Sequence, residues 1–284
     1  MDVRVMLEAL RLDAEGTGTF RAHNMPGGDR DVVFGGQLLA QSIACAAAQQ
    51  PGRSVKTVHS LFARGALVTQ PLDVDVEEMH AGRSIGSVMV TFRQSGRLCA
   101  RSLVLLSADE EDLVRHADRL TVGSTPSDPS ALMQDLGDWQ IRVVGGLDVL
   151  DPELVAPPEL DVWVRFVGAP SDDPTACQAL LSYATDGFLI GAAMLPHAGI
   201  GQAQAHVSIS TGVISHTLTF HEPFDAGGWL LLSQRSPYAG RGRSYGRADV
   251  FTEGGLLVAS YVQDAIVRRI PEGQSSSGSE RTYF

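Results

Sequence analysis

Apolar and polar positions follow two different patterns in the first half of the chain. Between Gly36 and Ala48 nearly every residue is apolar or small and there is no proline, which predicts a buried helix. After Pro51 the pattern changes to β-branched or alternating runs that are separated by glycine-bearing turns. The segment from Leu72 to Glu77 alternates strictly, as a half-buried strand does. The strands predicted in this half are 55–63, 72–78, 85–93 and 98–107.

The second half predicts a similar succession of elements. A strand is expected near 162–167, and a helical segment follows over roughly 174–194. The strands expected after it are 207–210, 214–221, 229–235, 244–251 and 256–267. A helix followed by antiparallel strands, without a βαβ alternation, favours an α+β fold.

Short motifs of the first half return in the second half. His59-Ser60-Leu61-Phe62 is matched by His216-Thr217-Leu218-Thr219, an offset of 157 residues. Gly82-Arg83-Ser84-Ile85-Gly86 is matched by Gly242-Arg243-Ser244-Tyr245-Gly246 at an offset of 160, and Gly96 by Gly255 at 159. Solenoid repeats have periods of about 20–50 residues, so this period indicates a duplicated β-rich module. Two copies of one module can build a site at their interface.

Composition shifts suggest where the modules end. A charge run at 109–112 predicts the solvated start of a linker helix, and prolines and serines punctuate 125–130 and 156–158. The segment 273–280 is rich in serine and glycine, which is typical of disorder. We therefore predict a first module over 1–108, a linker over 109–159, a second module over 160–270 and a disordered tail over 271–284.

Composition also narrows the class of protein. In 284 residues, 44 % are hydrophobic and 19 % are charged, so each module can bury a core. The net charge of −11 argues against nucleic-acid binding. The sequence has no apolar run near the ~18 residues that cross a bilayer, so no membrane insertion is expected. The absence of a secretory pattern after Met1 and three well-separated cysteines favour a reducing, cytoplasmic compartment.

Two motifs that suggest catalytic chemistry have simpler interpretations. Gly82–Gly86 fits the G-x-S-x-G nucleophile elbow, but a strand is expected to follow it and the second copy carries the same pattern, so it indicates a turn. The histidines between 197 and 221 lack the spacing of metal ligands, so no metal site is predicted. Ordinary hydrogen-bonded histidines are the better interpretation.

Asp186 and Gln263 are polar residues in apolar surroundings. Asp186 lies in a mostly apolar helical stretch, where a carboxylate is costly unless it has partners. Gln263 lies in the apolar last strand, at a position where the first module has Val104. Each alone fits a satisfied structural polar group. Together they can hold a water molecule against an electrophilic carbonyl.

Several motifs together resemble the acyl-CoA thioesterase II family, over residues from about Leu10 to Arg269. They are Val33-Phe34-Gly35-Gly36-Gln37, His59-Ser60-Leu61, Gly82-Arg83-Ser84, Leu195-Pro196-His197, Phe220-His221-x-Pro223-Phe224 and Leu257-Val258-Ala259-Ser260-x-Val262-Gln263. The resemblance implies a double hotdog fold, in which two antiparallel sheets each wrap around a long helix. It also implies hydrolysis of acyl-CoA to free CoA and a carboxylic acid, with no metal, cofactor or covalent intermediate.

In this family an Asp, a Thr or Ser and a Gln orient the attacking water. The resemblance assigns the Asp to Asp186 and the Gln to Gln263, whereas the hydroxyl position falls on Val213. The acid that usually precedes the following histidine is Ser215 here. Ser215 or Thr211, each two positions from Val213, can supply the hydroxyl because alternate strand residues share a face.

The missing hydroxyl leaves an alternative open: a catalytically weak or inactive acyl-CoA-binding hotdog protein. Loss of one orienting group would weaken catalysis rather than abolish it, since general-base assistance contributes about 10²–10⁴-fold. A hotdog hydratase is less favoured because that class uses a neighbouring Asp and His, and the histidine nearest Asp186 in sequence is His197.

The expected substrate contacts begin at the start of the first helix, where Gly35, Gly36 and Gln37 can present backbone N–H groups to the thioester carbonyl. His59 is a further candidate contact. Arg235, Arg241, Arg243 and Arg247 are either a solvated face or a clamp for the CoA phosphates, with Arg241 and Arg243 as its leading members. A homo-oligomer is expected, because hotdog modules often associate further.

Overall fold

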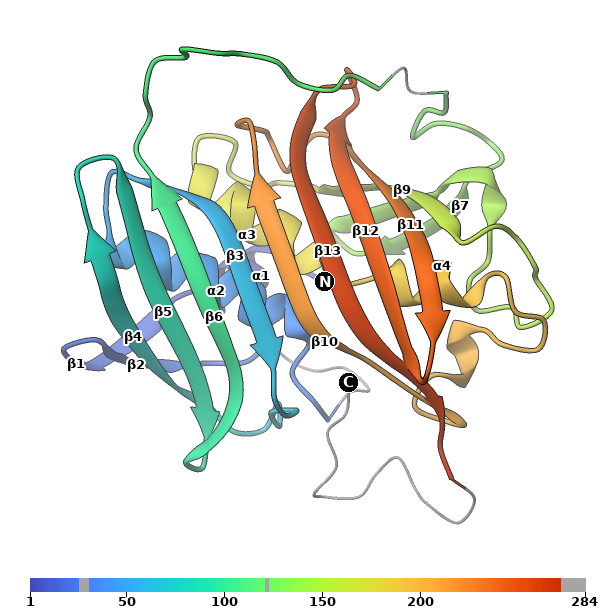
Figure 1. Ribbon diagram of the computed structural model, residues 1–284, viewed down its shortest axis with the longest axis horizontal. Coiled ribbons are helices and arrows are strands. Elements are labelled where there is room, and N and C mark those ends of the chain that lie inside the picture. Colours follow the sequence, from blue (N-terminus) through green and yellow to red (C-terminus); the bar gives the residue numbers. More distant parts are fainter. Residues whose placement is uncertain (26–30, 121–122, 272–284) are drawn as a thin grey trace.

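The protein is built around one large sheet that carries helices on one face. The computed structural model describes residues 1–25, 31–120 and 123–271, so most of the predicted tail lies outside the described residues. Within these ranges thirteen antiparallel strands form a single sheet in the order β1-β2-β4-β5-β6-β3-β10-β13-β12-β11-β9-β8-β7. Figure 1 shows its open face, with the helices behind. We call the helix-covered side the inner face and the open side the outer face.

The first half contributes one end of the sheet and the first long helix. Its predicted helix and four strands are confirmed with small changes at their ends. Two short strands precede them and continue the sheet beyond β4. The elements are α1 (Val3–Glu8), β1 (Leu12–Gly16), β2 (Thr19–Ala22), α2 (Gly35–Gln49), β3 (Ser54–Phe62), β4 (Leu72–Ala81), β5 (Ile85–Gln94) and β6 (Arg97–Ser107).

The second half repeats this order of elements. The two strands predicted over 207–210 and 214–221 are one continuous strand, and the helical segment is split in two. The elements are β9 (Glu159–Phe166), α3 (Pro174–Thr185), α4 (Leu189–Met194), β10 (Ile209–Phe220), β11 (Leu230–Gly240), β12 (Arg243–Thr252) and β13 (Leu257–Arg269). The strand order β2-β4-β5-β6-β3 is mirrored by β10-β13-β12-β11-β9, as the predicted double hotdog requires.

The two modules meet at the antiparallel pair β3–β10, which Figure 1 shows at the middle of the sheet. Val58 is paired with Val104 in the first module as His216 is paired with Gln263 in the second. In the structure His216 therefore corresponds to Val58, one residue before the His59 that the sequence motifs matched with it. His216 is completely buried on the inner face, whereas the half-buried His59 alternates with the buried Val58 and Ser60 and so lies on the outer face. The motif match of the two histidines is wrong in register.

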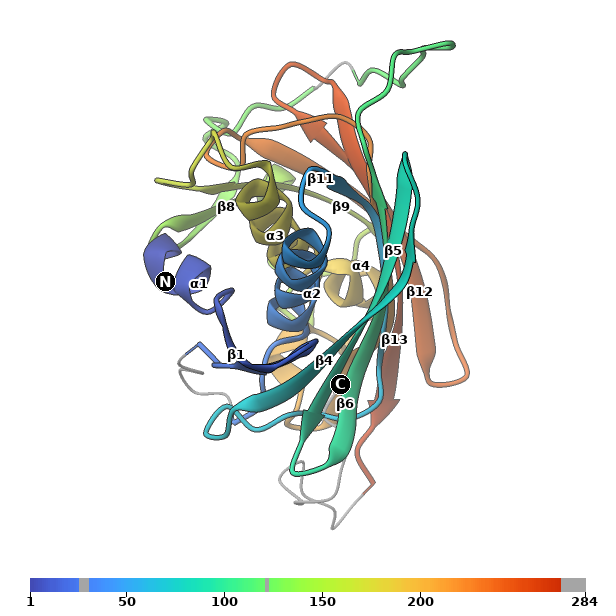
Figure 2. The same ribbon diagram turned by 90° about the vertical axis from the view of Figure 1, so that its left-hand side faces the viewer.

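The helices α2 and α3 pack against each other over the inner face, as Figure 2 shows. They approach each other closely at Gly36, where a Cβ atom would lie 2.5 Å from the carbonyl oxygen of Tyr183. Only glycine fits between the two backbones there. This contact brings the start of α2 to the end of α3. No helix in the described ranges is long and apolar enough to cross a membrane.

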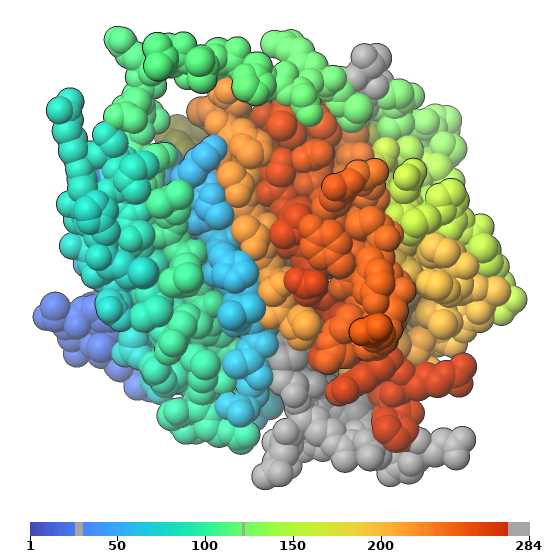
Figure 3. Space-filling view, in the orientation of Figure 1, coloured from blue at the N-terminus to red at the C-terminus, as the bar shows by residue number. Residues whose placement is uncertain are grey.

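The stretch predicted as a linker contains more than a connection. Residues 109–112 form no helix, so that prediction is wrong, and Figure 3 shows the connection running along one end of the sheet. Farther on, β7 (Leu132–Leu136) and β8 (Trp139–Val143) form a hairpin that continues the sheet beyond β9. The hairpin brings Trp139 into the core.

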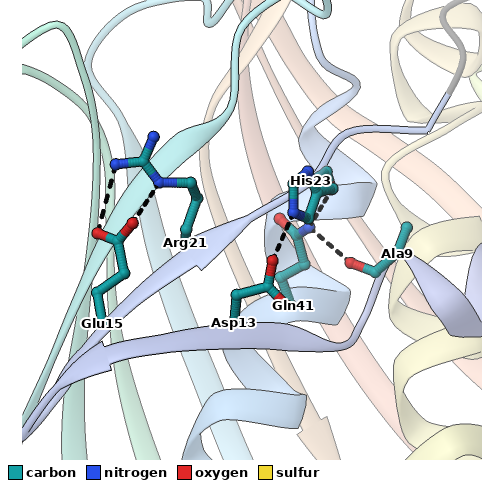
Figure 4. A network of polar contacts seen from close by, with 6 residues as sticks. All are labelled: Ala9, Asp13, Glu15, Arg21, His23 and Gln41. Carbon is teal, nitrogen blue, oxygen red and sulfur yellow. Dashed lines mark hydrogen bonds and ion pairs between the residues drawn. The ribbon is translucent and has the colours of Figure 1, made fainter.

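The N-terminal segment lies across α2 and reaches the second half. Gln41 on α2 donates from Nε2 to the carbonyl oxygens of Ala9 (2.8 Å) and His23 (3.1 Å), as Figure 4 shows. At its other end, the backbone N–H of Val3 donates to the Asp138 carboxylate at 3.0 Å, in the turn between β7 and β8. The segment therefore ties the two halves together on the side of the helices away from the sheet.

Candidate active site

Asp186 lies at a break between two helices. The predicted helical segment over 174–194 ends at Thr185 and starts again at Leu189, with Asp186 as the C-terminal cap of α3. Phe188 has φ +70°, a left-handed conformation that costs about 1–3 kcal/mol for such a residue. The strained turn directs the chain into α4 and leaves the Asp186 side chain beside the α2 start.

Aromatic packing supports this turn. The Trp139 ring lies 5.5 Å from the Tyr183 ring and 6.3 Å from the Phe188 ring, measured between ring centroids. Tyr183 also meets Phe34, the residue before α2, at 4.9 Å in an edge-to-face arrangement. The residues on either side of Asp186 are thus held by the β8 strand and by the approach to α2.

The Asp186 carboxylate lies against the first residue of α2. A Cβ atom at Gly35 would lie 2.7 Å from Asp186 Oδ2 and 3.3 Å from the edge of the Phe62 ring. The Asp186 side chain is only 4 % exposed. The positive end of the α2 dipole favours a negative charge at this position. A glycine at the start of α2 therefore lets the carboxylate approach a helix end that stabilises it.

Gln263 and His216 complete a buried polar group with Asp186. Gln263 Nε2 lies 3.4 Å from Asp186 Oδ1 and 3.2 Å from His216 Nδ1. His216 Nδ1 is itself 3.9 Å from Asp186 Oδ1. On its other side, His216 Nε2 lies 3.2 Å from the Thr185 hydroxyl.

Burial fixes the ionisation of the neighbouring groups. The pKa of His216 is lowered to about 3, mainly by burial and further by the nearby His59, so its imidazole is neutral at pH 7. Its ring stacks on that of Tyr261 at 5.4 Å. The pKa of Tyr261 is raised well above its usual value by burial and then by the negative charge of Asp186. The site therefore combines a carboxylate with neutral hydrogen-bonding groups.

The structure does not bring Ser215 to this site. The pairing of β10 with β13 shifts between Val213 and Ser215, a β-bulge that breaks their common face. Ser215 instead donates to the Asp264 carboxylate at 2.8 Å, where the side chains are exposed. The prediction that Ser215 shares a face with Val213 is wrong because of this extra residue.

Thr211 is buried on β10 but lies far along the strand. It pairs with Val267, four residues beyond Gln263 on β13, so about 13 Å separates it from the Gln263 position. Val213 pairs with Ala265, and both are buried. The position expected to carry a hydroxyl is therefore apolar, and neither substitute lies beside Asp186 and Gln263.

The predicted substrate contacts divide into near and distant groups. Gly35 and Gly36 lie next to Asp186 and Tyr183, within the candidate site. Gln37 instead bonds the chain before α2, accepting from the Met25 N–H and donating to Asn24, each at 3.1 Å. His59 bonds the Thr217 hydroxyl at 2.7 Å on the outer face, so the sheet separates it from Asp186.

The four arginines of the predicted clamp lie at two different places in the structure. Arg241 and Arg243 lie at the turn between β11 and β12, and Arg243 pairs with Ile266, about 10 Å along β13 from Gln263. Arg235 and Arg247 are a cross-strand pair that lines a cavity of about 830 Å³. The residues lining this cavity do not include Asp186 or Gln263, so it is separate from the candidate site.

The first module has hydrocarbon where the second has this polar group. Val58 and Val104 occupy the positions of His216 and Gln263, as the strand pairings show. Val88 occupies the position of Gly246, the residue that pairs with Gln263 on β12. All three valines are at most 1 % exposed. The duplication therefore carries its polar group in one copy.

Comparison with known proteins gives the family. Residues 23–107 match the model of the acyl-CoA thioesterase N-terminal domain, and residues 111–267 match that of the C-terminal domain. The chain belongs to the acyl-CoA thioesterase II family.

Its relatives support this membership over nearly the whole length. The chain is 24 % identical to acyl-CoA thioesterase 2 of Haemophilus influenzae, over 93 % of this chain and 96 % of the relative. It is 23 % identical to human acyl-coenzyme A thioesterase 8, over 86 % and 83 %.

Solved structures show the same architecture. The acyl-CoA thioesterase II TesB2 of Mycobacterium marinum superposes with a TM-score of 0.80 at 26 % identity, covering 95 % of this chain and all of that one. A hotdog-fold protein of unknown function from Alicyclobacillus acidocaldarius superposes at 0.74 and 17 % identity, covering 94 % and 98 %. The double hotdog prediction is confirmed.

His216 belongs to the site, but the sequence did not indicate that it lies beside Asp186 and Gln263. Sequence spacing indicated an ordinary hydrogen-bonded histidine. The signal that was missed is strand register, because pairing the last strand with β10 places His216 directly opposite Gln263.

The depressed pKa of His216 predicts how stability depends on pH. Because the folded protein holds this ring neutral down to about pH 3 while the unfolded chain takes up a proton near pH 6.5, stability falls as pH decreases below about 6.5. The contribution should be about 2 kcal/mol between pH 6.5 and 5. Denaturant unfolding of the wild type and of His216→Gln at both pH values measures it. An equal pH dependence in the two proteins would contradict the assignment.

Proposed function

We propose that this protein hydrolyses acyl-CoA thioesters to a carboxylic acid and free CoA, with a water molecule held between Asp186 and Gln263. The observation that carries the proposal is the buried Asp186 carboxylate, 3.4 Å from the Gln263 amide and against the start of α2. Family membership supports the substrate class, since the relatives from Haemophilus influenzae and human are acyl-CoA thioesterases by name.

The proposed reaction needs a base, a water-orienting group and a donor for the carbonyl oxygen. Asp186 takes a proton from the water as the water oxygen attacks the thioester carbonyl, and Gln263 holds the water in line. Backbone N–H groups at Gly35 and Gly36 stabilise the charge that develops on the carbonyl oxygen. When the carbon–sulfur bond breaks, the CoA sulfur leaves as a thiolate and takes the proton from Asp186. No covalent intermediate forms.

Two groups rather than three then orient the water. Val213 offers no hydroxyl, Ser215 faces the other way, and Thr211 is displaced along β10. This supports a second candidate, a hotdog protein that binds acyl-CoA and hydrolyses it weakly or not at all. A hydratase is still not favoured, although His216 does approach Asp186, because no part of the His216 side chain is exposed to a substrate.

The remaining expectations extend this proposal. Acyl chains would lie along apolar helix and inner strand faces. The arginines of the β11–β12 turn would meet the CoA phosphates. A cytoplasmic location and a homo-oligomer remain predictions of the sequence, and light scattering after size-exclusion chromatography tests the second.

Thiol release from acyl-CoAs of short to long chain tests the proposal. The wild type should release thiol from at least one chain length. Asp186→Asn should lower kcat by about 10²–10⁴-fold, because the amide cannot take the proton from water.

Ser215→Ala is the matched control, since the Ser215 hydroxyl bonds Asp264 on the outer face and should not affect kcat. Saturable acyl-CoA binding without thiol release would favour the second candidate. Full activity in Asp186→Asn would remove Asp186 from the mechanism.

The duplicated turn provides a test of phosphate binding. Arg243→Ala should raise KM several-fold with little change in kcat, because the contact is to a part of the substrate that does not react. Arg83→Ala changes the arginine of the matching sequence motif in the first module, in the turn between β4 and β5, and should leave KM unchanged. The KM increase should shrink at high salt. Equal KM values for the two variants would contradict a role of this turn.

A further inference from the structure

The buried polar group around Asp186 contains two residues that the proposed mechanism does not use. Thr185 and His216 are both completely buried. They join Gln263 to the backbone of α3 through a chain of hydrogen bonds. Which atom donates in each of these hydrogen bonds follows from the last group of the chain, a backbone carbonyl oxygen that can only accept.

The chain starts at a group that can only accept. The Thr185 hydroxyl lies 2.8 Å from the carbonyl oxygen of Ser182, and this oxygen has no proton to give. The single hydroxyl proton of Thr185 is therefore used in that bond. Toward His216, 3.2 Å away, the Thr185 oxygen can only accept, so His216 Nε2 must carry the ring proton.

The ring then determines how Gln263 is oriented. A neutral imidazole that is protonated at Nε2 has a lone pair at Nδ1, and burial keeps this ring neutral. Nδ1 lies 3.9 Å from a carboxylate oxygen of Asp186, so two acceptors face each other. The Gln263 amide nitrogen lies within 3.4 Å of both and can donate one proton to each.

We propose that Thr185 and His216 are positioning residues that fix the Gln263 amide, with its N–H₂ group toward Asp186 and its oxygen toward the attacking water. This inference rests on the proposed thioesterase function. A water molecule can then donate one proton to the Gln263 oxygen and the other to Asp186, which directs its own lone pair at the thioester carbon. The arrangement gives Gln263 a defined acceptor role in a site whose usual hydroxyl position is Val213.

Removing the Thr185 hydroxyl tests this chain with little change of shape. In Thr185→Val the acceptor for His216 Nε2–H is lost, so the ring is free to take the other tautomer and to turn the Gln263 amide around. We expect kcat to fall about tenfold with KM unchanged, as losses of orienting partners commonly do. Thr185→Ser keeps the hydroxyl and should restore kcat.

Thr219→Val is the matched control. Within the described residues, the Thr219 hydroxyl bonds the Thr57 hydroxyl at 3.2 Å, on the outer face of the sheet. Its kcat should equal that of the wild type. Thermal unfolding of all variants shows whether a lost activity is a lost fold.

A second readout needs neither a variant nor activity. Nitrogen-15 spectra of labelled histidine distinguish a ring protonated at Nε2 from one protonated at Nδ1, and His216 in the wild type should carry its proton at Nε2. A proton at Nδ1, or a Thr185→Val enzyme with wild-type kcat, would overturn the proposal. If the wild type releases no thiol from any acyl-CoA, the thioesterase function fails, while the spectra still decide the tautomer.

Discussion

A carboxylate that is almost completely buried sets the conditions for the rest of the structure. An ionised carboxylate in a protein interior loses hydration worth several kcal/mol unless nearby groups replace it. Here the start of α2 supplies a positive dipole end and Gln263 supplies an amide donor. A helix terminus contributes about 0.3–2 kcal/mol. The helix belongs to the first half of the chain and Asp186 to the second, so the contribution of the helix dipole is available only when the two halves are joined.

Several features of the fold serve this junction. The β3–β10 pairing fixes the two halves side by side, and the close contact at Gly36 brings the start of α2 to the end of α3. The β7–β8 hairpin supplies Trp139, which packs on residues before and after Asp186. The strained Phe188 turn persists because this packing determines its position. The first module has no need of such support, since valines fill the matching positions.

The sequence predicted the elements well where hydrophobic periodicity is strong. The helix that begins near Gly36, most of the strands in both copies, and the choice of Asp186 and Gln263 as candidate residues follow from apolar patterns that polar residues interrupt. What failed depended on single-residue register, which a pattern of period two does not fix. The bulge before Ser215 moved that hydroxyl to the outer face, and a shift of one residue separated His59 from His216. The break after Thr185 and the hairpin near Trp139 arise from tertiary packing that local sequence does not encode.

In the proposed reaction, water oriented by Asp186 and Gln263 attacks the thioester directly. A single turnover of an acyl-CoA in oxygen-18 water, with enzyme in excess, tests it through the mass of the acid and of the peptide that contains Asp186. Direct attack by water predicts one oxygen-18 atom in the released acid and none in the Asp186 side chain. Oxygen-18 in the Asp186 carboxylate would show that this residue forms a covalent acyl intermediate, and would rule out direct attack by water.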